Sequence, residues 1–120
     1  MSNSIVEIED TKCIFIFGYN AADSHPIVAR RIVKAKEKGA QIIVCDPRYI
    51  ESARLADIHL ALKNGSNIAL INALAHVIIA ENLHDKAFID GHTEQFEEYR
   101  KLVEPYTPES VEAITGLKAE

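Results

Sequence analysis

The runs C-I-F-I-F (Cys13–Phe17) and Q-I-I-V-C (Gln41–Cys45) decide the fold. Short, continuous runs of β-branched and aromatic residues are typical of strands buried on both faces of a parallel sheet. Between them, Ile27–Lys38 alternates apolar and basic residues at helical spacing and ends at Gly39, a favourable helix stop. Ile58–Leu62 predicts a third strand. This order predicts an α/β fold with a three-layer arrangement, in which a parallel sheet has flanking helices.

The second half of the chain predicts helices. Ile50–Ala56 is long enough for one or two helical turns, and Ser66 is placed to cap an apolar helix that runs to about Glu81. The short amphipathic segments that follow have no strand partners; they are Asp85–Asp90, Glu94–Val103 and Pro108–Ile114. We therefore predict a ligand-binding α/β unit over residues 1–83 and a helical extension of the same domain over residues 84–120.

Composition excludes several classes of protein. The chain has 120 residues, 48% of them hydrophobic and 26% charged, which suits one globular domain and argues against disorder. Two cysteines are too few for a disulfide scaffold, a zinc finger or a self-contained iron–sulfur site. The net charge of -5 argues against general attraction to nucleic acid or to an anionic membrane.

The chain carries no recognisable export or membrane signal. Met1–Asp10 has acids and no base, unlike a secretory leader. The longest apolar stretch, Ile68–Ala80, is interrupted by Asn72 and His76 and falls short of the roughly 20 residues that span a bilayer. These features predict a cytoplasmic protein without a membrane partner.

Three loops follow the predicted strands, and all are rich in small and polar residues: Gly18–Ser24, Asp46–Arg48 and Lys63–Asn67. In an open parallel sheet, ligands bind outside the carboxyl ends of the strands, and topology brings these loops to that edge. The first loop leads into a helix N-terminus, which favours a phosphate, and Asn20 and Ser24 add side-chain donors.

The other two loops extend the same interpretation. Asp46 ends the second strand, where a carboxylate can accept hydrogen bonds from ribose hydroxyls, and Arg48 can meet a phosphate or stack on a base. Gly65 opens another helix N-terminus, and Asn67 can contact the edge of a base. The alternative is a purely structural role, because loops of this composition also form ordinary turns. In addition, the G-x-G-x-x-G fingerprint of dinucleotide-binding folds is absent.

The remaining candidate residues indicate structure rather than chemistry. The five histidines, which include His59, show no metal-ligand spacing, and no nucleophile, base and orienting group occur together. We therefore predict no catalytic and no metal-ligating residue in this chain. One helix carries a basic face, which suits a helix C-terminus better than nucleic-acid binding; it comprises Arg30, Arg31, Lys34, Lys36 and Lys38.

Several motifs resemble one family in order along nearly the whole chain. The sequence is similar to the catalytic subunit of molybdenum- or tungsten-dependent formate dehydrogenases, within the molybdopterin oxidoreductases. D-P-R at a strand end occurs widely among those oxidoreductases, whereas D-S-H-P and K-N-G-S-N resemble the formate dehydrogenase branch. The matching segments are Gly18–Pro26, Ile42–Arg48, Ala53–Asp57, Leu62–Leu70, Phe96–Arg100 and Tyr106–Gly116.

The resemblance implies a Rossmann-like domain that holds one molybdopterin guanine dinucleotide. Carried over by motif, Asn20, Asp23 and Ser24 would meet the pyrophosphate and guanosine side, Asp46 and Arg48 the guanosine, and Gly65 and Asn67 the guanine end. The expected cofactor-binding set is Gly18, Asn20, Asp23, Ser24, Cys45, Asp46, Arg48, Gly65 and Asn67. Cys45 is included for its backbone.

The resemblance also implies a longer parent protein. The family's 4Fe–4S cysteine cluster, its cysteine or selenocysteine metal ligand and its active-site arginine have no counterpart in this sequence. Formate oxidation to carbon dioxide would need the remainder of the catalytic subunit and its electron-transfer subunits as partners, so the isolated chain should be inactive. The alternatives are a free-standing nucleotide-binding or regulatory module and a structural domain with a vestigial edge.

Overall fold

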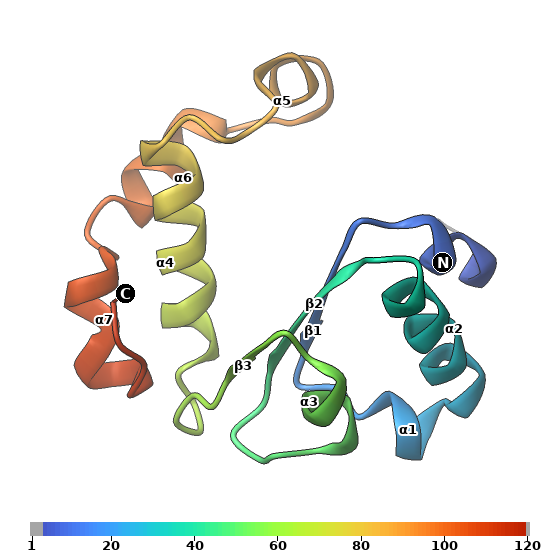
Figure 1. The fold of residues 1–120 in the computed structure, drawn as a ribbon. Coiled ribbons are helices and arrows are strands. Elements are labelled where there is room, and N and C mark those ends of the chain that lie inside the picture. The colour runs from blue at the N-terminus through green and yellow to red at the C-terminus, as the bar shows by residue number, and fades with distance from the viewer. Residues whose placement is uncertain (1–3, 120) are drawn as a thin grey trace. The chain divides into compact units, whose positions relative to one another are not determined.

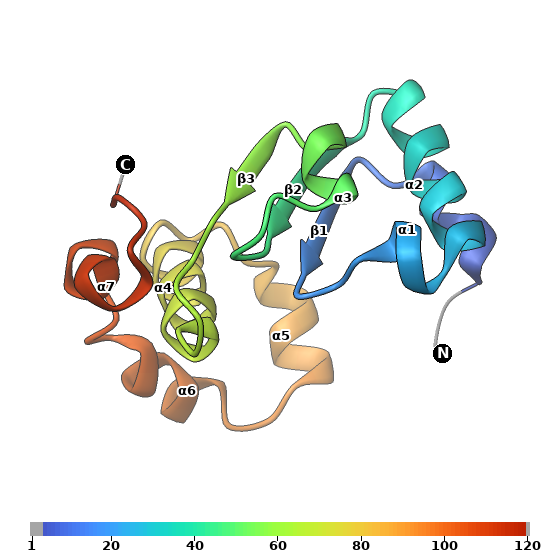
Figure 2. The same ribbon diagram turned by 90° about the horizontal axis from the view of Figure 1, so that it is seen from below.

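The computed structural model describes residues 4–119, which form two compact units, Met1–Ala61 and Leu62–Glu120. The first unit contains a parallel sheet of three strands in the order β1-β2-β3, with β2 in the middle (Figures 1 and 2). The strands are β1 (Cys13–Phe17), β2 (Gln41–Cys45) and β3 (Ile58–Leu60). The first two have the predicted bounds, and the third ends two residues early. The predicted α/β class, with a parallel sheet and flanking helices, is confirmed.

Helices connect the strands of this unit. The helix α2 (Pro26–Glu37) joins β1 to β2 and begins on a proline, which is favourable in the first turn. Asp23 and Ser24 are both of the residue types that would be expected to cap this helix, but neither does: His25 occupies the N-cap, and the other two residues belong to a short preceding helix. The remaining elements are the 3-10 helix η1 (Ile5–Asp10), α1 (Ala21–Ser24) and α3 (Glu51–Leu55).

The core of the first unit lies between the sheet and these helices. Side chains alternate across a strand, so Ile16, Ile42 and Val44 all point to the helical side, where they pack with Ile32. Phe15, on the opposite side of its strand, is 45% exposed. This packing fixes the sheet's orientation and therefore the direction in which the strand-end loops project.

The basic face of α2 is paired with acids of η1. Arg31 donates to Glu9, and the Lys34 and Lys38 ammonium groups lie 3.4 and 3.7 Å from the same carboxylate. Lys38 also pairs with Asp10 at 3.2 Å. The hydrogen bond from Arg31, with that from Lys34, lowers the pKa of Glu9 below its ordinary value. These pairs give the basic face a structural role within the unit.

Asp57, just before β3, links three segments of the first unit. Its carboxylate accepts the Ile42 N–H at 2.8 Å and the Lys36 ammonium at 3.0 Å. The Ile42 bond, followed by that of Lys36, lowers the pKa of Asp57.

Replacing this carboxylate should therefore change how stability depends on pH. A lowered carboxyl pKa adds stability above its unfolded value, which is lost as the pH falls through the folded value. We expect Asp57→Asn to lower the unfolding free energy at pH 7, with the difference from wild type shrinking as the pH falls below the ordinary carboxyl pKa and vanishing below the lowered folded-state pKa of Asp57. Urea unfolding at a series of pH values checks this, with Glu98→Gln, an exposed carboxylate, as the control. A difference that persists undiminished at low pH would contradict it.

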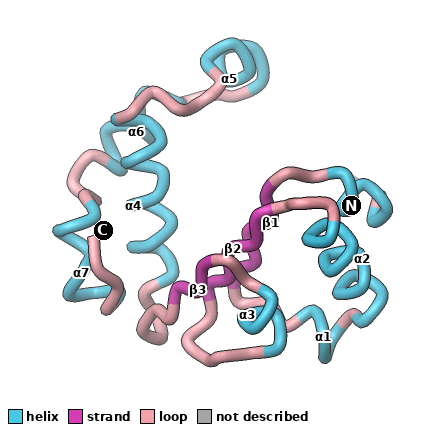
Figure 3. The backbone as a smooth tube through the Cα atoms, viewed as in Figure 1, coloured by secondary structure: helices cyan, strands magenta, loops and turns pink. Residues whose placement is uncertain are grey.

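The second unit consists of helices and loops in its described part (Figure 3). Ala69, Ala73 and Val111 form a small buried cluster, and His76 Nδ1 lies 3.1 Å from the carbonyl oxygen of Val103. None of the helices described here is both long and apolar enough to cross a membrane. The helices are α4 (Asn67–Ala80), α5 (Lys86–His92), α6 (Phe96–Val103) and α7 (Pro108–Thr115), of which α6 and α7 pack against α4.

Two sequence expectations concern the start of α4. Ser66 does occupy its N-cap, but the hydroxyl does not cap the helix; it donates to the Lys63 carbonyl at 2.6 Å instead. By contacts, α4 groups with the helices that follow it, since the compact units divide after Ala61. The predicted boundary after residue 83 separates a ligand-binding unit from a helical extension, and this functional division stays a prediction.

Candidate functional site

Two of the predicted loops meet at the carboxyl ends of β1 and β2. Phe17 is paired with Cys45 at the end of the ladder, so the loops leave the sheet side by side. The Gly18 N–H donates to the Cys45 carbonyl at 2.9 Å and ties them together. Seven predicted binding residues therefore belong to the adjoining ends of β1 and β2 or to the segments that follow them in the first unit: Gly18, Asn20, Asp23, Ser24, Cys45, Asp46 and Arg48.

The other two predicted residues belong to the second unit. Gly65 lies in the turn before α4 with a φ of +84°, a left-handed conformation that favours glycine, and Asn67 is the first residue of the helix. That the third loop meets the other two at one site stays a prediction.

Asp46 is the anchor of the second loop. It is only 4% exposed, although an ionisable side chain is rarely buried without partners. Its Oδ1 accepts the Arg48 backbone N–H at 2.8 Å and lies 3.4 Å from the Arg48 Nε. The Arg48 side chain remains 74% exposed. The pair thus combines a fixed carboxylate with an accessible guanidinium, which suits a ligand that carries both hydroxyl and phosphate groups.

Asn20 contributes an unsatisfied acceptor to the first loop. Its amide nitrogen donates to Asp23 Oδ2 at 2.6 Å, while its Oδ1 is buried and has no hydrogen-bond partner among the described residues. Buried polar atoms are nearly always paired, so an orphaned oxygen at a strand-end loop points to a missing donor. A hydroxyl or amino group of a ligand would satisfy it. The loop also turns at Gly18, whose φ is +56°.

Cys45 has a structural environment. Burial raises the pKa of its thiol to about 11, so the thiol stays protonated near neutral pH and is a poor nucleophile. Its carbonyl oxygen already accepts the Gly18 N–H. That Cys45 contacts a ligand through its backbone stays a prediction.

The structure adds two residues to this edge that sequence reasoning did not assign. His59, in the middle of β3, has its Nε2 2.9 Å from the Asp46 carbonyl oxygen. The ring of Tyr49 meets the His59 ring edge-on, with centroids 5.4 Å apart. No sequence signal marks His59, because a single histidine in a short strand has no motif around it.

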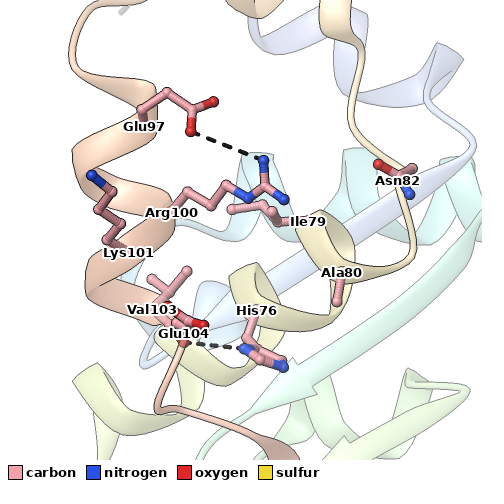
Figure 4. Close-up of a pocket in the computed structure, with 9 residues that line it drawn as sticks. All are labelled: His76, Ile79, Ala80, Asn82, Glu97, Arg100, Lys101, Val103 and Glu104. Carbon is pink, nitrogen blue, oxygen red and sulfur yellow. Dashed lines mark hydrogen bonds and ion pairs between the residues drawn. The ribbon is translucent and has the colours of Figure 1, made fainter.

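A pocket of about 380 Å³ lies elsewhere, between α4 and α6 of the second unit (Figure 4). Part of its polar lining is paired: Glu97 and Arg100 lie 3.9 Å apart, and His76 contacts the Val103 carbonyl. It contains none of the nine predicted binding residues.

The strand-end loops of the first unit carry side chains of several chemical kinds. Among residues 4–119, no group of three or more histidine, cysteine or acidic side chains is placed to hold a metal ion. The strand-end loops instead present a carboxylate, a guanidinium and an unpaired amide oxygen. Groups of these kinds are the ones with which proteins recognise and orient polar ligands.

Comparisons with known proteins agree on one family. Residues 1–115 match the family model described as molybdopterin oxidoreductase. The chain is 69% identical over 119 residues to formate dehydrogenase H of Escherichia coli (strain K12), covering 99% of this chain and 17% of that protein. It is 50% identical over 120 residues to the F420-dependent formate dehydrogenase 1 subunit alpha of Methanococcus maripaludis, covering 100% of this chain and 18% of that one.

A solved structure agrees as well. Acetylene hydratase from Pelobacter acetylenicus superimposes with a TM-score of 0.85 at 30% identity, covering 96% of this chain and 17% of the hydratase chain. The chain thus spans less than a fifth of the length of each of these three relatives.

Proposed function

Because this chain belongs to the molybdopterin oxidoreductase family, we propose that it binds the guanine dinucleotide form of the molybdopterin cofactor within a formate dehydrogenase catalytic subunit. The parent enzyme would oxidise formate to carbon dioxide in the cytoplasm and pass two electrons to a 4Fe–4S cluster held outside this chain. Its partners would be the remainder of the subunit and the electron-transfer subunits.

The observation that carries the proposal is the buried Asp46 carboxylate, which directly follows β2 and accepts the Arg48 N–H, next to Cys45, whose carbonyl ties the start of the Gly18–Ser24 loop to this strand end. Asp46 would accept hydrogen bonds from the ribose hydroxyls, and Arg48 would meet a phosphate or stack on the guanine. Asn20 Oδ1 would accept from a donor of the ligand. The first loop and, from the second unit, Gly65 and Asn67 would complete the cradle.

These residues do no redox chemistry. In the proposed enzyme the bound molybdenum or tungsten supplies the two-electron step, and the protein supplies affinity and orientation. The Asp46 carboxylate and the Arg48 guanidinium balance each other in charge before the ligand arrives. Arg48 can turn from Asp46 toward a phosphate, since its side chain is mostly exposed.

The test is the guanine nucleotide content of the full-length subunit that contains this chain. Acid hydrolysis of the purified protein should release GMP in a fixed ratio to protein, and the same preparation should oxidise formate. A subunit that holds metal but releases no GMP would contradict the dinucleotide assignment. Metal-independent binding of GDP by a protein with no formate oxidation would favour a free-standing nucleotide-binding module instead.

Asn20→Ala should separate ligand binding from stability. The change removes one hydrogen bond to Asp23 and also removes a buried, unsatisfied oxygen; these effects oppose each other and are of similar size. We expect the unfolding free energy of the ligand-free chain to stay within about 1 kcal/mol of wild type. The subunit should nevertheless lose guanine nucleotide about five-fold faster, since the ligand loses an acceptor. Equal release rates would contradict a role for this oxygen.

A further inference from the structure

His59 binds the backbone carbonyl of Asp46, the first residue of the second strand-end loop. It lies on β3 directly beside Val44 of β2, and its Nε2–H donates to the Asp46 carbonyl oxygen over 2.9 Å. A carbonyl can only accept, so the imidazole carries its proton on Nε2. The ring is half-buried, and Tyr49 packs edge-on against it at a centroid distance of 5.4 Å. The bond thus joins the second loop to a neighbouring strand.

This bond occurs where the sheet no longer orients the chain. The ladder between β2 and β3 ends at the pair Cys45 and Leu60, one residue before Asp46. The following residue is Pro47, which has no N–H, so the Asp46–Pro47 peptide offers only its carbonyl for hydrogen bonding. Its rotation is therefore set through that carbonyl, which is the group that His59 holds.

The orientation of this peptide controls the binding groups. The Asp46 carboxylate leaves the same residue whose carbonyl His59 fixes, and its Oδ1 accepts the Arg48 N–H across the proline. A rotation of this peptide would carry the Arg48 N–H and guanidinium away from the Asp46 carboxylate, which leaves the Cα before the rotating bond. Tyr49 follows Arg48, and its ring packs against the His59 ring. His59 on β3 therefore contacts both ends of the loop, the Asp46 carbonyl at one end and the Tyr49 ring at the other.

We infer that His59 is a positioning residue for the dinucleotide site: it sets the Asp46–Pro47 peptide through its Nε2–H and so holds Arg48 against the Asp46 carboxylate in the arrangement that meets the ligand. This inference rests on the proposed function. It assigns to β3 a part in ligand recognition that does not require His59 to touch the ligand.

Side-chain reach provides the test. Glutamine places an amide nitrogen as many bonds from Cβ as the imidazole Nε2, whereas asparagine reaches only as far as Nδ1. We would make His59→Gln, His59→Asn and His59→Leu in the full-length, cofactor-loaded subunit, with Asp46→Asn as the direct site variant. The rate at which GMP-releasing cofactor is lost during dialysis is measured beside the melting temperature.

The expected pattern is rescue by glutamine alone. His59→Leu and His59→Asn should lose the nucleotide about five-fold faster than wild type, whereas the rate for His59→Gln should stay within two-fold of wild type. Asp46→Asn should lose the nucleotide faster than any of the three His59 variants. If His59→Asn behaves like His59→Gln, or if the variants differ only in melting temperature, His59 has a structural role and the inference fails while the proposed function stands. If wild type carries no guanine nucleotide, both fail together.

Discussion

Asp46→Ala is expected to lower the guanine nucleotide retained by the full-length subunit by ten-fold or more. The change removes the buried carboxylate, its proposed bonds to the ribose, and the acceptor that holds the Arg48 N–H. Hydrogen bonds to charged groups contribute about 1.5–3 kcal/mol each, and 1.4 kcal/mol corresponds to a factor of ten in affinity. GMP released by acid hydrolysis, per mole of folded protein, measures the effect.

The matched control is Glu98→Ala, which removes an exposed carboxylate from α6 in the second unit. It should leave the nucleotide content unchanged. Asp46→Asn keeps the shape of the side chain while removing its charge, and should lie between wild type and Asp46→Ala. If Asp46→Ala retains nucleotide at the wild-type level, Asp46 does not bind the ligand, and the strand-end loops have a purely structural role.

Ile42→Ala is expected to destabilise the chain by about 2–5 kcal/mol, the range for removing a fully buried isoleucine side chain. Ile42 has no exposed surface, lies in the central strand and packs in the main core cluster. The loss combines the transfer free energy of three carbon atoms with the cavity that they leave. Equilibrium unfolding in urea, monitored by circular dichroism, gives the difference in unfolding free energy.

Ile27→Ala serves as the control for that measurement. Ile27 lies on α2 and is 67% exposed, so the same chemical change should alter the unfolding free energy by less than about 0.5 kcal/mol. Equal effects at the two positions would contradict the placement of Ile42 in the core of the first unit.

The sequence predicted the sheet because its signals are local. The apolar runs of β1 and β2 are bounded by glycine and by Asp46-Pro47, and strands buried in a parallel sheet require little more. The end of β3 was less predictable. Ala61 and Leu62 continue the apolar pattern, but pairing with β2 stops at Leu60, and the chain passes into the second unit after Ala61.

The candidate site was predictable to the level of its loops. Parallel topology alone brings the residues after β1 and β2 to one edge, and the Gly18 to Cys45 bond follows from that. The roles of single side chains depend on longer-range geometry. Whether Asn20 Oδ1 has a partner and whether His59 reaches the Asp46 carbonyl depend on packing between segments, for which sequence spacing contains no signal.

The helix caps show the same limit. Asp23 and Ser24 are ordinary capping residues by type, yet they form a short helix of their own, in which Asp23 accepts from Asn20. Ser66 occupies a cap position, but its hydroxyl binds the Lys63 carbonyl. Side chains of this kind have several backbone partners within reach, and the local turn decides among them.

The measurement that tests the central claim most directly is hydrogen–deuterium exchange of the full-length subunit with and without its cofactor. If the strand-end loops of the first unit bind the dinucleotide, peptides that contain Gly18–Ser24 and Cys45–Arg48 should exchange markedly more slowly in the loaded protein. Protection that leaves both segments unchanged while appearing elsewhere in the subunit would contradict the account.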